Sequence, residues 1–81
     1  MEVDFIIPEK KIAIEVKYQK TIHQEDYKSL RLVMRKKRFE NAYLLTKNLS
    51  EERDFPEGKI ISVPAWQIED LKEVISDPLK Y

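Results

Sequence analysis

Cysteine is absent from the sequence and histidine occurs once, and these two shortages exclude several kinds of site. Without cysteine the chain has no disulfide, no cysteine nucleophile and no Cys/His zinc centre. A multi-histidine metal site is excluded too, and a histidine-centred triad would rest entirely on His23. We interpret His23 as a surface residue near the start of a helix.

Long apolar runs and an excess of charge of either sign are also missing. No segment approaches the roughly 20 apolar residues of a membrane span, and the first residues do not resemble a signal peptide. We therefore expect a soluble, cytoplasmic protein with no membrane partner. Fifteen acidic and fifteen basic residues cancel, so net charge gives no general attraction to nucleic acid. Few glycines (one, Gly58) with 11 lysines and 10 glutamates are typical of proteins from thermophiles.

Alternation of apolar and polar side chains predicts two strands at the start of the chain, within residues 2–8 and 11–19. In the second segment Ile12, Ile14 and Val16 share one side, while Glu15 and Lys17 share the other. Only residues 8–10 separate the two segments, so we expect an antiparallel hairpin.

The remainder predicts a small α/β domain with a mixed sheet. A helix is expected over 24–38, with Thr21 and Gln24 as its capping box, and a buried strand over 41–47. Residues 48–58 are polar and end in a turn, a strand follows over 59–63, and a second helix begins at Pro64. The expected order is β-β-α-β-β-α in one domain spanning residues 1–81.

The polar face of the predicted hairpin carries the residues best suited to chemistry. If the register brings Asp4 opposite Glu15 or one step away, the two carboxylates come within reach of one ion. Such oxygen ligands suit Mg²⁺ or Mn²⁺, and Lys17 could stabilise charge that develops on a phosphate. The chemistry served by such a site is phosphodiester hydrolysis. The alternative is a solvated strand face with cross-strand ion pairs.

Asp4, followed after ten residues by Glu15-Val16-Lys17, resembles the motif of the PD-(D/E)xK nuclease superfamily, which has the restriction-endonuclease-like fold. Gln19 extends the motif to an E-x-K-x-Q form seen in several branches. The resemblance implies that Asp4 and Glu15 are metal ligands, Lys17 is the catalytic residue on the base side, and Gln19 supports the site. Val3 stands where the motif has proline.

A second resemblance covers most of the chain. The segments EVDFII, IAIEVKY, LLTKN and ISVPAW are similar to a C-terminal domain of archaeal ATPases, itself described as a divergent member of this superfamily. It implies an ATPase domain, in the same or another chain, as a partner. The superfamily core has a helix and a first strand before the Asp strand, and these are missing here. We therefore expect a truncated core, either a C-terminal fragment or a chain completed by a partner such as a second copy in a homodimer.

The predicted crossover helix is the one basic element: residues 21–39 hold two acids and six bases. It could bind a nucleic-acid backbone, or its bases could simply complement the helix dipole at a solvated end. The candidate nucleic-acid-binding residues are Lys20, Lys28, Arg31, Arg35, Lys36, Lys37 and Arg38.

Three functional hypotheses follow. The first is a Mg²⁺-dependent endonuclease-like domain that hydrolyses nucleic acid, with DNA favoured over RNA. The second is a non-catalytic interaction or dimerisation module that serves an ATPase. The third is a plain structural domain without a ligand, in which substituting Asp4 or Glu15 would change stability only slightly.

Overall fold

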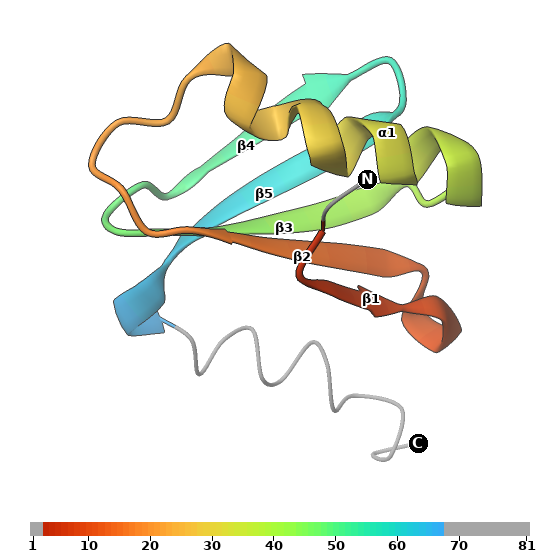
Figure 1. Cartoon of the computed structure of the whole chain (residues 1–81), viewed down its shortest axis with the longest axis horizontal. Helices are drawn as coiled ribbons and strands as arrows, with labels where there is room; N and C mark the ends of the chain where they lie inside the picture. Colours follow the sequence, from red (N-terminus) through yellow and green to blue (C-terminus); the bar gives the residue numbers. More distant parts are fainter. Residues whose placement is uncertain (1–2, 68–81) are drawn as a thin grey trace.

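Five strands and one α-helix make up residues 3–67, the part of the chain that the computed structural model describes. One sheet has the strand order β1-β2-β3-β5-β4; its three central strands are parallel and its two edge strands antiparallel to their neighbours (Figure 1). The expected α/β class with a mixed sheet is confirmed. The strands are β1 (Phe5–Ile7), β2 (Ile12–Lys17), β3 (Asn41–Thr46), β4 (Glu51–Phe55) and β5 (Gly58–Pro64).

The expected N-terminal hairpin is present. β1 runs antiparallel to β2, with Phe5 opposite Ile14 and Ile7 opposite Ile12. A 3-10 turn, η1 (Pro8–Lys10), joins the two strands, and the N–H of Lys11 donates to the Pro8 carbonyl at 3.0 Å. β1 has only three residues, so it forms a short edge to the sheet.

The crossover from β2 to β3 is helical, as expected, but it starts differently. A 3-10 turn, η2 (Gln24–Tyr27), leads into α1 (Lys28–Lys37). The predicted capping box of Thr21 and Gln24 is wrong: the Asp26 carboxylate accepts the N–H of His23 at 2.7 Å. Because a carboxylate three residues after the cap can reach back to its backbone, Asp26 takes the expected part of Gln24.

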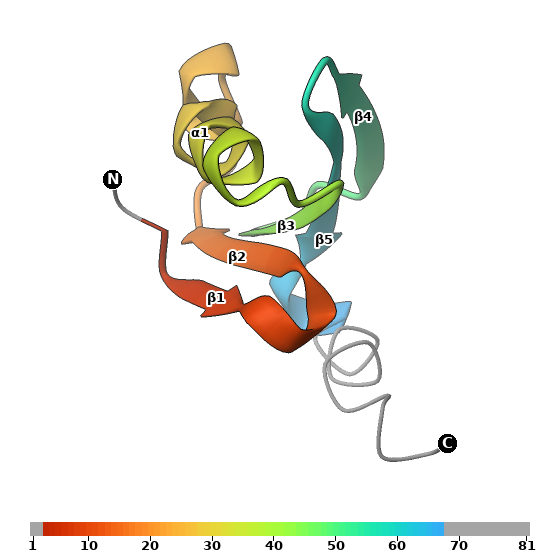
Figure 2. The ribbon, with the colours of Figure 1, turned by 90° about the vertical axis from the view of Figure 1, so that its right-hand side faces the viewer.

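α1 covers one face of the sheet, as Figure 2 shows with the helix seen end-on. Its buried residues Leu30, Val33 and Met34 meet small and aliphatic side chains of β2, β3 and β5. Each large aliphatic side chain buried in this way contributes about 1.5–3 kcal/mol. The sheet residues of this core are Ala13, Ala42, Leu44 and Ile60.

A second apolar cluster lies on the opposite face of the sheet. Ile14 and Leu45 are buried there, with Ile7, Tyr43 and Val63 packed against them. Successive residues of a strand point to opposite faces, so Ile14 lies on this face while Ala13 and Glu15 lie under α1.

Gly58, the single glycine, allows β5 to begin close to the end of α1. Its φ is +150°, and a Cβ added there would lie 2.4 Å from the Glu40 carbonyl oxygen. The adjacent N–H of Lys59 donates to that same oxygen at 2.9 Å. Gly58 therefore permits the backbone contact that holds the two segments together.

β4 was not predicted, since residues 48–58 were expected to be a polar loop ending in a turn. The turn at Pro56 and Glu57 is present, but β4 precedes it and pairs with β5. Across this hairpin the Lys59 ammonium lies 3.1 Å from a Glu52 carboxylate oxygen. Edge strands commonly carry charged side chains, which explains why β4 lacks an apolar pattern.

A 3-10 turn, η3 (Ala65–Gln67), follows β5. Most of the second helix predicted from Pro64 onward therefore lies outside the described residues. Within residues 3–67, no helix is long and apolar enough to cross a membrane.

Candidate functional site

Asp4 and Glu15 come together at the open end of the hairpin. Phe5 pairs with Ile14, so the residue before β1 lies beside the next residues of β2. The Asp4 carboxylate accepts the main-chain N–H of Val16 at 2.8 Å through Oδ2. The Asp4 side chain thus joins the two strands at the residue that precedes Phe5, the first paired residue of β1.

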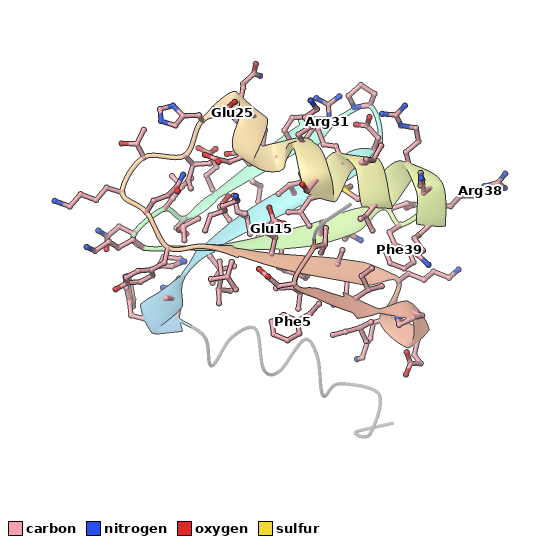
Figure 3. The ribbon with its side chains drawn as sticks, viewed as in Figure 1. Phe5, Glu15, Glu25, Arg31, Arg38 and Phe39 are labelled. Carbon is pink, nitrogen blue, oxygen red and sulfur yellow. The ribbon has the colours of Figure 1, made fainter. Side chains whose placement is uncertain are left out.

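A hollow of about 200 Å³ lies at this point between the hairpin and the helix. It is lined by Asp4, Glu15, Val16, Lys17 and Ser29. Figure 3 shows Glu15 between the sheet and α1, and this residue is only 6% exposed. A buried carboxylate is costly unless a hydrogen bond, a counter-charge or a metal stabilises it, so the hollow is a chemically distinct place on the surface.

Ser29, in the first turn of α1, is a site residue that no sequence motif indicates. It reaches the hollow because α1 crosses over β2, a placement that depends on tertiary packing. No local pattern separates Ser29 from an ordinary polar helix residue. Its hydroxyl can both donate and accept a hydrogen bond at the rim.

Gln19 lies apart from the other predicted site residues. Its amide Nε2 donates to the Asp26 carboxylate at 2.9 Å and to the Thr21 carbonyl at 3.0 Å. It does not line the hollow. Through these two hydrogen bonds Gln19 stabilises the loop that leads from β2 into η2.

The donor set of the hollow fits a hard divalent cation. Two carboxylates and a hydroxyl supply only oxygen ligands, which Mg²⁺ and Mn²⁺ prefer. Nowhere in residues 3–67 do three or more His, Cys, Asp or Glu side chains gather as a metal cluster. Mg²⁺ is commonly held by one or two carboxylates together with water and substrate phosphates, so Asp4 and Glu15 could serve as its protein ligands.

Comparison with protein families finds a match for the chain. A profile described as a domain of unknown function (DUF4143) matches residues 1–68. The chain belongs to the DUF4143 family. No curated protein and no solved structure shows a significant match. The matched region includes every candidate site residue, from Asp4 to Arg38.

In this DUF4143 domain the basic residues of α1 divide between two sides of the helix. On the side of the β4–β5 turn, Arg31 donates to Glu57 at 2.9 Å and its guanidinium lies 4.6 Å from the centre of the Phe55 ring. Arg35 is 3.9 Å from the same carboxylate. The hydrogen bond from Arg31 holds the pKa of Glu57 below its ordinary value, with a further contribution from the charge of Arg35. Arg31 is therefore engaged in the fold.

Lys36 lies on the other side of α1. It follows Ser29 by seven residues, almost two full turns, so both residues share the helix side that faces the hollow. Except for Arg31, all the candidate nucleic-acid-binding residues are exposed. A broad surface depression of about 480 Å³ includes Lys28, Arg31 and Arg35 on the side away from the hollow.

Proposed function

We propose that this DUF4143 domain is a metal-dependent, nuclease-like domain that hydrolyses phosphodiester bonds in nucleic acid, with DNA as the favoured substrate. The observation that carries the proposal is the hollow in which Asp4, Glu15 and Lys17 converge. The resemblance of these residues to the PD-(D/E)xK motif supports the same chemistry. Burial of Glu15 beside Asp4 favours a site over a solvated strand face.

Each side chain would have a separate role. Asp4 and Glu15 would hold Mg²⁺ or Mn²⁺, which when bound supplies a Lewis acid for a phosphoryl oxygen and lowers the pKa of a water molecule. Lys17, on the same strand side as Glu15, would bring a positive charge to the phosphate as negative charge develops. Ser29 would offer its hydroxyl to a phosphate oxygen or to a water molecule at the rim.

Exposed bases on α1 support binding of the substrate backbone. Lys36 shares a helix side with Ser29, about two turns further along α1, so it would contact a phosphate of a strand that extends from the hollow along the helix. Lys28 and Arg35 would add weaker, sequence-independent attraction from the far side of the helix. Arg31 would contribute less, because Glu57 already compensates its charge.

A Mn²⁺ titration followed by amide NMR tests the metal site before any cleavage assay. We expect selective broadening around Asp4, Glu15 and Val16, and loss of this effect in Asp4→Asn, which preserves an acceptor for the Val16 N–H. Glu25→Gln, an exposed acid in η2, is the matched control and should broaden as the wild type does. Broadening spread over surface acids and unchanged in Asp4→Asn would refute the site.

Cleavage of labelled DNA with Mg²⁺ or Mn²⁺ then tests the reaction itself. We expect slow hydrolysis that Glu15→Gln and Lys17→Met abolish, whereas Lys10→Met, in the η1 turn at the other end of the hairpin, retains it. A site that binds Mn²⁺ without any cleavage would contradict the nuclease activity and retain only the metal site.

The second candidate, an interaction or dimerisation module that works with an ATPase, is favoured by the β1 edge. β1 ends the sheet, and its residues Phe5 and Ile6 are 58% and 39% exposed. Domains of this family are often found with ATPases. Sedimentation equilibrium of the wild type and of Ile6→Lys tests the homodimer: a dimer that the substitution dissociates supports the module, and a monomer at all concentrations opposes self-association.

A further inference from the structure

The carboxyl ends of β2, β3 and β5 meet at one edge of the sheet (Figure 1). Lys17, Thr46 and Pro64 are paired across these strands. Directly beyond them come Tyr18 after β2, Lys47 after β3 and, within η3, Trp66 after β5. Ligands of α/β sheets commonly bind outside the carboxyl ends of the strands.

Two of these three side chains are large exposed aromatics. Tyr18 is 64% exposed and Trp66 is 69% exposed, the highest values among the large apolar residues of the described chain. Neither ring belongs to the clusters packed on the two faces of the sheet. Their aromatic area is therefore available to a ligand.

A cation accompanies the aromatic rings. The Lys47 ammonium lies 5.5 Å from the centre of the Tyr18 ring, within the range of a cation–π contact. The contact places a positive charge at the same edge, while Tyr18 as a whole stays exposed. Aromatic faces together with a lysine are the combination that binds single-stranded nucleic acid, through stacked bases and a compensated phosphate.

We propose that Tyr18, Lys47 and Trp66 form a binding site for single-stranded nucleic acid, in which the rings stack on unpaired bases and Lys47 contacts the backbone. The inference rests on the proposed function and narrows its substrate to strands with unpaired bases. Tyr18 is the neighbour of Lys17, so a strand on this edge lies next to the hollow. Bases paired within a duplex do not offer their faces to such rings, so duplex DNA binds more weakly here.

The single tryptophan of the chain makes the site directly observable, because Trp66 is the only source of indole fluorescence. The full 81-residue chain is titrated with an oligothymidylate of about 12 nucleotides, within the usual size range of such sites. The titration is made at low salt, where binding to phosphates is strongest, and with a chelator that removes divalent metal ions and so prevents cleavage. We expect saturable quenching of the Trp66 emission, and weaker quenching by a duplex of equal length.

Variants assign the contacts, with binding followed by the anisotropy of a labelled oligothymidylate. Removing a stacked ring in Tyr18→Ala or Trp66→Ala should weaken binding by about 5- to 150-fold, and Trp66→Phe should largely restore it. Lys47→Gln should reduce the slope of log affinity against log salt by about 0.7. Phe5→Ala, which removes another exposed ring (58%) that lies on β1, is the matched control and should bind as the wild type does.

Several outcomes would overturn the site: no quenching, a duplex that binds as tightly as the single strand, or Tyr18→Ala and Trp66→Ala binding normally. A change in Trp66 emission with protein concentration alone, or with anionic phospholipid vesicles in place of the oligonucleotide, would assign this edge to a second copy or to a membrane surface. The two proposals also fail separately. Quenching of Trp66 without a Mn²⁺ site or cleavage would support the single-strand-binding site and refute the nuclease. A Mn²⁺ site with cleavage but without quenching would support the nuclease and refute the single-strand-binding site.

Discussion

The Asp4 carboxylate accepts the main-chain N–H of Val16 at 2.8 Å, although both residues lie outside the residue pairs that join β1 to β2. One side chain therefore closes the open end of the hairpin and also lines the hollow beside Glu15. The Asp4 carboxylate therefore has a structural role, as the acceptor of the Val16 N–H, and a proposed chemical role, as a metal ligand. Asp4→Asn should keep the first role and lose the second, whereas Asp4→Ala should lose both.

The first prediction concerns stability at Asp4. Asp4→Ala removes the acceptor of the Val16 N–H and should lower the free energy of unfolding by about 1 kcal/mol, the usual net value of one hydrogen bond. Asp4→Asn keeps a side-chain oxygen and should stay within about 0.5 kcal/mol of the wild type. Urea unfolding followed by circular dichroism measures both, with Glu9→Ala as an exposed control. Equal stability of the Ala and Asn variants would show that this hydrogen bond contributes nothing.

The second prediction concerns Gly58. Gly58→Ala should destabilise the domain by about 1–3 kcal/mol, because the backbone has a φ of +150° and the new Cβ would press on the Glu40 carbonyl. Thermal unfolding should show a clearly lower Tm than for the wild type, whereas Ser50→Ala in the exposed loop before β4 should be nearly neutral. An unchanged Tm would mean that the β5 start and the α1 end can separate at no cost.

The third prediction concerns acid stability. The pKa of Glu57 in the folded state is held below 4.5, mainly by the hydrogen bond from Arg31. The stabilisation is therefore fully present above the unfolded-state pKa and is lost as the pH falls through the lower folded-state value. We expect the wild type to exceed Glu57→Gln in stability at neutral pH and the difference to shrink below about pH 4.5.

Urea midpoints of both proteins, measured from about pH 7 down to about pH 3, check this sign. Glu25→Gln, an exposed acid in η2, is the control. A difference from the wild type that is constant over the whole range would contradict an electrostatic origin. Added salt should also reduce the difference, because Arg31 is partly exposed.

Sequence patterns predicted β2 and α1 because the side chains on each face of these elements recur at a regular period. Ile12, Ile14 and Val16 alternate with Ala13 and Glu15 because β2 has one face under α1 and the other on the second apolar cluster. The helix was found because its buried residues recur at a helical period. The proximity of Asp4 to the residues around Glu15 followed from the expected hairpin.

The missed features depend on contacts that no local pattern records. β4, with the sequence EERDF, is an edge strand whose pairing with β5 holds it in place. Ser29 reaches the hollow only through the crossing of α1 over β2. Gln19 fits the motif in sequence, yet its amide is used by Asp26 and Thr21, because β2 ends at Lys17 and the chain turns away.

The two edges of the sheet also differ in what they permit. Along β4 the side chains of Glu51, Glu52, Arg53 and Asp54 are charged, whereas β1 carries Phe5, Ile6 and Ile7. Growth of a polymer by strand addition needs two adhesive edges on every molecule, so that each unit added exposes a new one. Because only the β1 edge is apolar, a domain that associated through β1 would cover this edge in both copies, and the assembly would stop at a dimer.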